Sequence, residues 1–95
     1  MKLFVYGIFL DGGLREAIFN REVQAQPATL ENYTFGPLVY GRFKGIVKRN
    51  GEKVEGMILD LNDTEIITTD RIEGNGYRRI GVGIGRDYVQ VYVPV

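Results

Sequence analysis

The chain opens with a compact hydrophobic run at residues 3–6 that ends at Gly7. Apolar β-type residues bounded by glycine predict a buried strand, which we expect to begin at residue 2. Glycines soon afterwards mark residues 7–13 as a turn directly after that strand. Hydrophobic residues then recur with helical spacing, which predicts one or two helical turns that end at Asn20.

The middle of the chain has an extended pattern, with aromatic residues spread over 23–47. Asn50 and Gly51 then give the strongest short-range hairpin signal, because both tolerate the positive φ angles of a type I′ turn. The sequence therefore predicts a hairpin in which residues 46–49 pair with residues 53–61.

A second helix is predicted over residues 63–72. Asn62 can cap its first turn, and Glu65, three positions later, completes a capping box. Gly74 lies at the expected C-terminal stop. Three isoleucines are the candidates for its buried stripe: Ile66, Ile67 and Ile72.

Two further strands follow. In the first, apolar residues alternate with glycines at 81, 83 and 85, so one face is apolar and the other has no side chains. That bare face can accept a backbone, an aromatic ring, a ligand or a second copy of the chain. A turn at 86–87 leads to a last strand over 88–93. The order β-α-β-β-β-α-β-β predicts an α+β fold with a mostly antiparallel sheet that can curl into a barrel.

Length and charge restrict the picture further. Ninety-five residues make one domain over 1–95, which we expect to be a monomer or a small homo-oligomer. Twelve basic and twelve acidic residues cancel, so no net field favours nucleic acid or an anionic membrane. The N-terminal apolar run is broken by Asp11 and is too short for a membrane span. We therefore expect a cytoplasmic protein that binds neither nucleic acid nor membrane.

The missing residue types decide which chemistry is open to the chain. It has no cysteine, histidine or serine, which excludes thiolate and imidazole metal sites and a Ser-His-Asp triad. We expect no metal and no organic cofactor. Acid–base chemistry near neutral pH then falls to Asp, Glu, Tyr or Lys, with arginine or backbone amides stabilising charge.

Glu73 is the first candidate for such chemistry. It lies at the end of the predicted helix, where the helix dipole disfavours a negative charge. Dipole and burial together would raise its pKa and suit it to act as a general base. The alternative is a surface glutamate paired with Arg78 or Arg79, which is the more common arrangement when position alone is considered.

Two other groups of residues can form a binding site. The turn after Tyr6 and Gly7 can present consecutive backbone N–H groups to an anion or a carbonyl, although an ordinary strand-to-helix turn fits the same residues. Tyr77, Tyr40 and Tyr92 can line a pocket or form half-buried core.

Three segments form a series with a recognisable order. Residues 3–12 (LFVYGIFLDG) resemble a Y-G-T-L signature with a following glycine, and residues 54–61 (VEGMILDL) resemble a V-x-G strand. Residues 69–80 resemble an L-D-x-x-E-G…Y-x-R block, as TDRIEG followed by YRRI. Over nearly the whole chain this series is similar to the gamma-glutamylcyclotransferase-like family, which includes the gamma-glutamylamine cyclotransferases.

The resemblance implies a small mixed, mostly antiparallel β-barrel with two short flanking helices. It also implies an enzyme of the transferase or lyase type that releases an amine or amino acid from a small gamma-glutamyl amide while forming 5-oxoproline. The family's catalytic glutamate falls on Glu73. Its substrate-binding loop falls on Tyr6, Gly7, Ile8 and Phe9, and Tyr77 joins them as a pocket residue. The alternative is a catalytically inactive module of the same fold that binds a small ligand.

Overall fold

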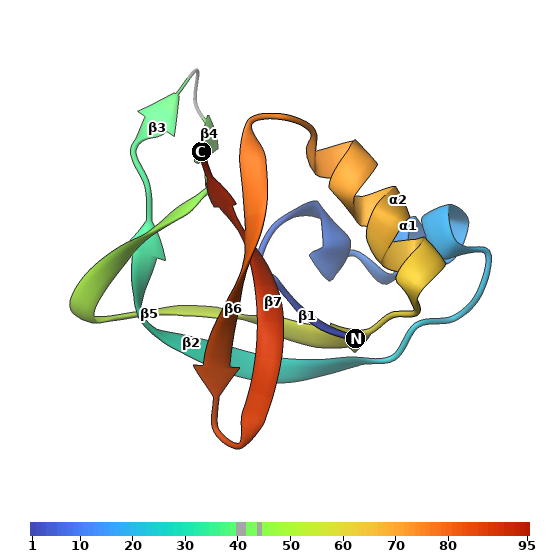
Figure 1. Cartoon of the computed structure of the whole chain (residues 1–95), viewed down its shortest axis with the longest axis horizontal. Coiled ribbons are helices and arrows are strands. Elements are labelled where there is room, and N and C mark those ends of the chain that lie inside the picture. Colours follow the sequence, from blue (N-terminus) through green and yellow to red (C-terminus); the bar gives the residue numbers. More distant parts are fainter. Residues whose placement is uncertain (40–41, 44) are drawn as a thin grey trace.

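The computed structural model describes residues 1–39, 42–43 and 45–95, with side chains outside 38–44 (Figure 1). Its elements, in chain order, are β1 (Lys2–Val5), the 3-10 helix η1 (Ile8–Leu10), α1 (Gly12–Phe19), β2 (Ala25–Phe35), β3 (Leu38–Val39), β4 (Arg42–Phe43), β5 (Ile46–Asp60), α2 (Asp63–Glu73), β6 (Tyr77–Ile84) and β7 (Asp87–Pro94).

Five strands form one sheet in the order β2-β5-β1-β7-β6, and β3 and β4 form a separate pair. Neighbours in the large sheet are antiparallel except β1 and β7, which run parallel. The predicted α+β fold with a mostly antiparallel sheet is confirmed. Barrel is a loose description, because the edge strands β2 and β6 touch but no ladder joins them among the described residues.

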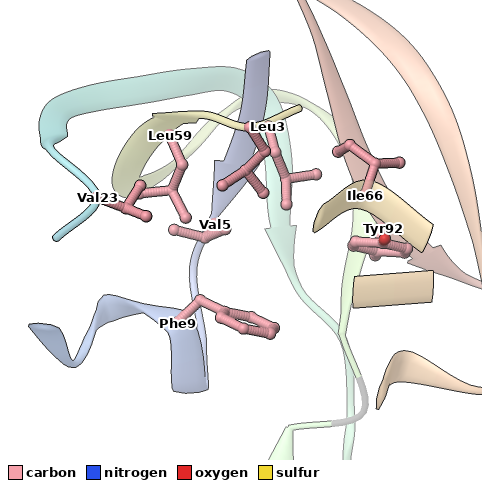
Figure 2. Close-up of a cluster of buried hydrophobic side chains, with 8 residues drawn as sticks. Leu3, Val5, Phe9, Val23, Leu59, Ile66 and Tyr92 are labelled. Atoms are coloured by element: carbon pink, nitrogen blue, oxygen red, sulfur yellow. The ribbon is translucent and has the colours of Figure 1, made fainter. Parts of the chain in front are cut away.

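The central strand β1 is buried on both faces, which explains its uninterrupted apolar run. The first core cluster lies on the side of the two α-helices and consists of Leu3, Val5, Phe9, Val23, Leu59, Leu61, Ile66 and Tyr92 (Figure 2). The second cluster, on the other face, consists of Phe4, Leu30, Ile46, Val54, Val89, Val91 and Val93. Because the first cluster includes Phe9 and Ile66, it ties the loop after β1 to α2.

The predicted hairpin at Asn50 and Gly51 is wrong. β5 continues through these residues and pairs with β2 on both sides of them. The register shifts at Asn32, opposite residues 49–52, and the Asn32 side chain accepts a hydrogen bond of 3.1 Å from the Gly51 N–H. Gly51 takes a φ of 86°, so the two residues bend a long strand instead of reversing the chain. Pairing with β2, which is distant in the sequence, outweighs the local turn preference of these two residues.

Both α-helices end where local signals predict. Asn62 caps α2, and the Glu65 side chain accepts the Asn62 N–H, so the capping box is present. α2 extends one residue beyond the prediction, to Glu73, and Gly74 ends it with a φ of 76°. α1 ends at Asn20, which has a left-handed conformation. Within the described residues, no helix has the length and apolar character that a membrane crossing needs.

The buried face of α2 differs from the predicted stripe of isoleucines. Ile66 is buried, but Ile67 and Ile72 are 51% and 42% exposed, and Thr69 is fully buried instead. Positions 66, 69 and 73 recur at intervals of three and four, so they share one face of the helix. That face carries Glu73 toward the sheet.

The last hairpin turns at Gly85 and Arg86, one residue earlier than the predicted turn at 86–87. Gly85 has a φ of 59°, which suits the first position of a two-residue hairpin turn. The bare glycine face is partly covered, since a Cβ at Gly81 would overlap the Tyr88 side chain.

Candidate active site

Glu73 is the last residue of α2 and is half-buried. Its carboxylate has no hydrogen bond or ion pair within the described part of the chain. The predicted alternative of pairing with Arg78 or Arg79 is therefore wrong, and the Arg79 Nε lies 2.8 Å from Asp70 Oδ1 instead. Burial raises the pKa of Glu73 above its ordinary value. A desolvated carboxylate without a partner is more typical of a functional group than of a structural one.

The loop after β1 faces this helix end. It turns at Gly7 into η1, where the Leu10 N–H donates to the Gly7 carbonyl at 3.0 Å. The first N–H groups of a helical turn have no acceptor inside it, so they can bind a ligand. Ile8 is 58% exposed, whereas the Phe9 ring stacks on Phe19 with centroids 5.9 Å apart. Phe9 is buried among the side chains of the first core cluster (Figure 2). Phe9 therefore anchors the loop in the first core cluster.

A cavity of about 280 Å³ lies between this loop and the end of α2. All six predicted site residues line it: Glu73, Tyr6, Gly7, Ile8, Phe9 and Tyr77. Tyr92 lines the cavity too and also belongs to the first core cluster. It is therefore both a pocket residue and a core residue, the two roles that the sequence left open. Tyr40 lies outside the described residues.

The cavity has one carboxylate, Glu73, and no lysine or arginine among the described residues that line it. Burial raises the pKa of Tyr6, and the nearby charge of Glu73 adds to this effect. Burial and a hydrogen bond to Asp70 raise the pKa of Tyr92. Both hydroxyls therefore keep their protons at neutral pH, and the site favours a cationic group such as an ammonium.

Four described lining residues were not predicted: Phe4, Val5, Gly45 and Ile72. Gly45 has a φ of 146°, and a Cβ there would lie 2.7 Å from the Pro94 ring and 3.2 Å from the Tyr77 ring. Only glycine fits this position without moving a cavity wall. The glycine directly before an apolar strand was the available sequence signal, but nothing local connects it with the site.

Arg15 was also missed. From α1 its guanidinium donates to the carbonyl oxygens of Phe9 and Leu10, at 2.9 and 3.1 Å. These bonds tie the end of η1 to α1. The contact depends on how α1 folds back on the loop, which residue spacing alone does not reveal.

Other binding features are few. The described residues include no group of three or more Asp, Glu, His or Cys that could hold a metal ion. A second, polar hollow of about 410 Å³ lies between α1 and the start of β2, and none of the predicted site residues lines it.

Comparison with known proteins gives sequence relatives over most of the chain. The family model for gamma-glutamyl cyclotransferase, AIG2-like, matches residues 3–94. Protein AIG2 C of Arabidopsis thaliana is 33% identical over 86 residues, and AIG2-like protein A of the same plant is 31% identical over 87. Each match covers 90% of this chain but 52% and 53% of the relatives, so the chain spans about half their length.

Solved structures have a similar fold. Two solution structures of Arabidopsis thaliana proteins have TM-scores of 0.87 and 0.85, at 32% and 28% identity. These matches cover 99% of this chain and 61% and 68% of the other chains. The structure of a gamma-glutamyl cyclotransferase has a TM-score of 0.77 at 16% identity, covering 100% of this chain and 66% of that one, which shows a shared fold.

Proposed function

The chain belongs to the AIG2-like gamma-glutamyl cyclotransferase family, and from this membership we propose that it cleaves a small gamma-glutamyl amide. The products are 5-oxoproline and a free amine or amino acid. The observation that carries the proposal is Glu73, a half-buried carboxylate with a raised pKa and no partner among the described residues. It lies in the wall of the cavity that residues 6–9 close on the other side.

The substrate supplies its own nucleophile, the α-amine of the glutamyl group. Glu73 accepts one proton from the α-ammonium, and the nitrogen lone pair attacks the γ-carbonyl carbon. The bond from this carbon to the leaving nitrogen then breaks as Glu73 returns the proton to that nitrogen. The ring nitrogen still carries one proton more than the lactam does, and this second proton passes to the released amine, which departs as an ammonium. Atoms and charges balance without a serine, cysteine or histidine. Closure of a five-membered ring also gains from intramolecular proximity.

The rest of the cavity suits this reaction. Backbone N–H groups of the loop at residues 7–9 stabilise the negative charge on the γ-carbonyl oxygen at the tetrahedral stage. Glu73, the single carboxylate among the described lining residues, attracts the substrate ammonium, and Tyr6 and Tyr77 provide aromatic walls. A volume of about 280 Å³ lies at the small end of ligand pockets, which suits a compact gamma-glutamyl compound.

The test is incubation of the protein with a panel of gamma-glutamyl amino acids and amines, followed by mass spectrometry of 5-oxoproline. Glu73→Gln keeps the shape of the side chain but cannot accept the proton. We expect it to lower kcat by at least about a hundredfold. Glu16→Gln is the matched control, because Glu16 is an exposed glutamate on α1 and should leave turnover unchanged.

Two results would contradict the proposal. If the wild-type protein forms no 5-oxoproline from any member of the panel, the chain is a ligand-binding module of this fold. If Glu73→Gln retains turnover, another group moves the proton.

A further inference from the structure

Tyr92 forms hydrogen bonds to both walls of the cavity. Its backbone carbonyl accepts a 2.6 Å hydrogen bond from the Tyr6 hydroxyl, at the start of the loop. Its own hydroxyl donates a 2.6 Å hydrogen bond to Asp70 Oδ1, in the last turns of α2. One residue of β7 therefore holds both the loop and the helix end.

The helix side of this connection is a network with a defined direction. Arg79 donates from Nε and Nη2 to the two Asp70 carboxylate oxygens, at 2.8 and 3.2 Å, and these hydrogen bonds lower the pKa of Asp70. Asp70 is thus ionised and can only accept, so the Tyr92 proton points to it. Thr69 Oγ1 lies 2.6 Å from the same Tyr92 oxygen and 2.8 Å from the Ile66 carbonyl oxygen, so its single proton faces two acceptors.

The spacing along α2 links this network to Glu73. Asp70 and Glu73 are three residues apart and lie on neighbouring positions of one helix face. Glu73 is the final residue of the helix and has no bond of its own among the described residues. Its position therefore depends on the turn before it, which Tyr92 holds.

We propose that Tyr92 is a positioning residue: its hydroxyl fixes the end of α2 and its carbonyl fixes Tyr6, so Glu73 and the loop keep one separation. This inference rests on the proposed function of Glu73. The hydroxyl is not needed to fill the core, because the ring alone packs against the first core cluster. Its role is to hold Glu73 in a half-buried position, where misplacement by about 1 Å can cost a hundredfold in rate.

Tyr92→Phe tests this role, since it keeps the ring and the backbone carbonyl and removes only the hydroxyl. We expect the last turn of α2 to loosen, Glu73 to become more hydrated and its pKa to fall toward the ordinary value. The pKa is read by NMR titration of protein labelled with carbon-13 at the glutamate carboxyl, with Glu73 assigned from Glu73→Gln. The other titratable groups that line the cavity in the described chain are Tyr6, Tyr77 and Tyr92 itself. Asp70, which accepts the hydrogen bond of the Tyr92 hydroxyl, and its partner Arg79 are the charged groups next to that hydroxyl.

Kinetics add a second measurement. Because the carbonyl bond to Tyr6 remains, substrate binding at the loop should persist, so kcat should fall roughly tenfold or more while KM stays nearly constant. A merely structural hydroxyl would lower the melting temperature and leave both the titration and kcat unchanged below it.

Arg21→Gln is the matched control, because Arg21 forms a similar two-point ion pair with Glu65 at the other end of the same helix. It should lower the melting temperature without shifting the Glu73 titration. Tyr92 is not a positioning residue if its variant leaves the titration of Glu73 unchanged, or if Arg21→Gln shifts it equally. The titration needs no substrate, so it decides this point even where the wild type yields no 5-oxoproline, a result that overturns only the proposed reaction.

Discussion

The two ends of α2 are built from similar parts and serve different purposes. At each end an arginine from another segment binds a carboxylate through two nitrogens: Arg21 binds Glu65 near the start, and Arg79 binds Asp70 near the end. At the start, Glu65 also accepts the Asn62 N–H, so both of its carboxylate oxygens have hydrogen-bond donors. At the end, Glu73 follows the paired carboxylate and is left without a partner among the described residues.

The pKa shifts of the two glutamates express this difference. The hydrogen bond from Arg21 lowers the pKa of Glu65, whereas burial raises the pKa of Glu73. A glutamate with its charge satisfied stabilises the helix, and one with its charge unsatisfied costs stability but is ready to accept a proton. We therefore expect substitutions at the start of α2 to change stability alone, and those at its end to change chemistry.

The largest change in stability should come from Glu65→Ala. It removes the charge-assisted bonds to Arg21 and the cap on the Asn62 N–H, so unfolding in urea should become easier by about 2–3 kcal/mol. Because the pKa of Glu65 is lowered in the folded protein, its contribution is complete above the ordinary value of 4.5. The contribution is lost as the pH falls through the lowered folded value, so the penalty should shrink in acid.

Measuring turnover of the same variant shows whether the start of α2 affects only stability or also the reaction. At temperatures where Glu65→Ala remains folded, 5-oxoproline formation should equal that of the wild type. Lost turnover in the folded variant would show that the start of α2 also positions Glu73.

A smaller loss should follow Asn62→Ala, because the Asn62 side chain accepts the Glu65 N–H at 2.9 Å in the capping box. Substitutions of this kind cost about 1 kcal/mol, measured as a shift of the urea midpoint. Asn62→Ser is the control, because serine retains a capping oxygen and should keep most of the stability. If serine and alanine destabilise equally, the cap is not what Asn62 contributes.

The same helix illustrates what the sequence can predict. Its caps were found because Asn62, Glu65 and Gly74 act on backbone groups within four residues, and such signals are visible in the sequence. The hairpin at Asn50 and Gly51 failed because the strands that decide the pairing, β2 and β5, meet over a long sequence separation. The turn preference of Asn50 and Gly51 is a local signal and carries no information about pairing with β2.

The sequence predicted which residues line the candidate site, but not the hydrogen bonds and ion pairs that link them. The family resemblance pointed to Glu73 and to residues 6–9, and these residues do line one cavity. The sequence offered Arg78 or Arg79 as a partner for Glu73, whereas Arg79 binds Asp70, one helical turn earlier. The bonds of Tyr92 link three distant segments, and no spacing in the sequence encodes them.

The smallest predicted effect has the opposite sign: Glu73→Gln should make the protein more stable at pH 7. Burial raises the folded-state pKa of Glu73 above its unfolded value, so the folded protein binds this proton more tightly than the unfolded chain. The ionised carboxylate therefore costs stability above the folded pKa, and the cost disappears as the pH falls below the unfolded value. The amide resembles the protonated acid and avoids the cost, which we place below about 1 kcal/mol because Glu73 keeps part of its hydration.

Thermal unfolding of the wild type and Glu73→Gln at pH 7 and again at pH 4 measures this effect. The variant should melt a few degrees higher at neutral pH and nearly together with the wild type in acid, where the weakening of the Glu65 and Asp70 pairs affects both proteins equally. Glu16→Gln should show no difference at either pH, since Glu16 is exposed. Equal melting of Glu73→Gln and wild type at pH 7 would mean that the Glu73 carboxylate carries no cost in the fold, and the contrast between the two glutamates of α2 would then fail.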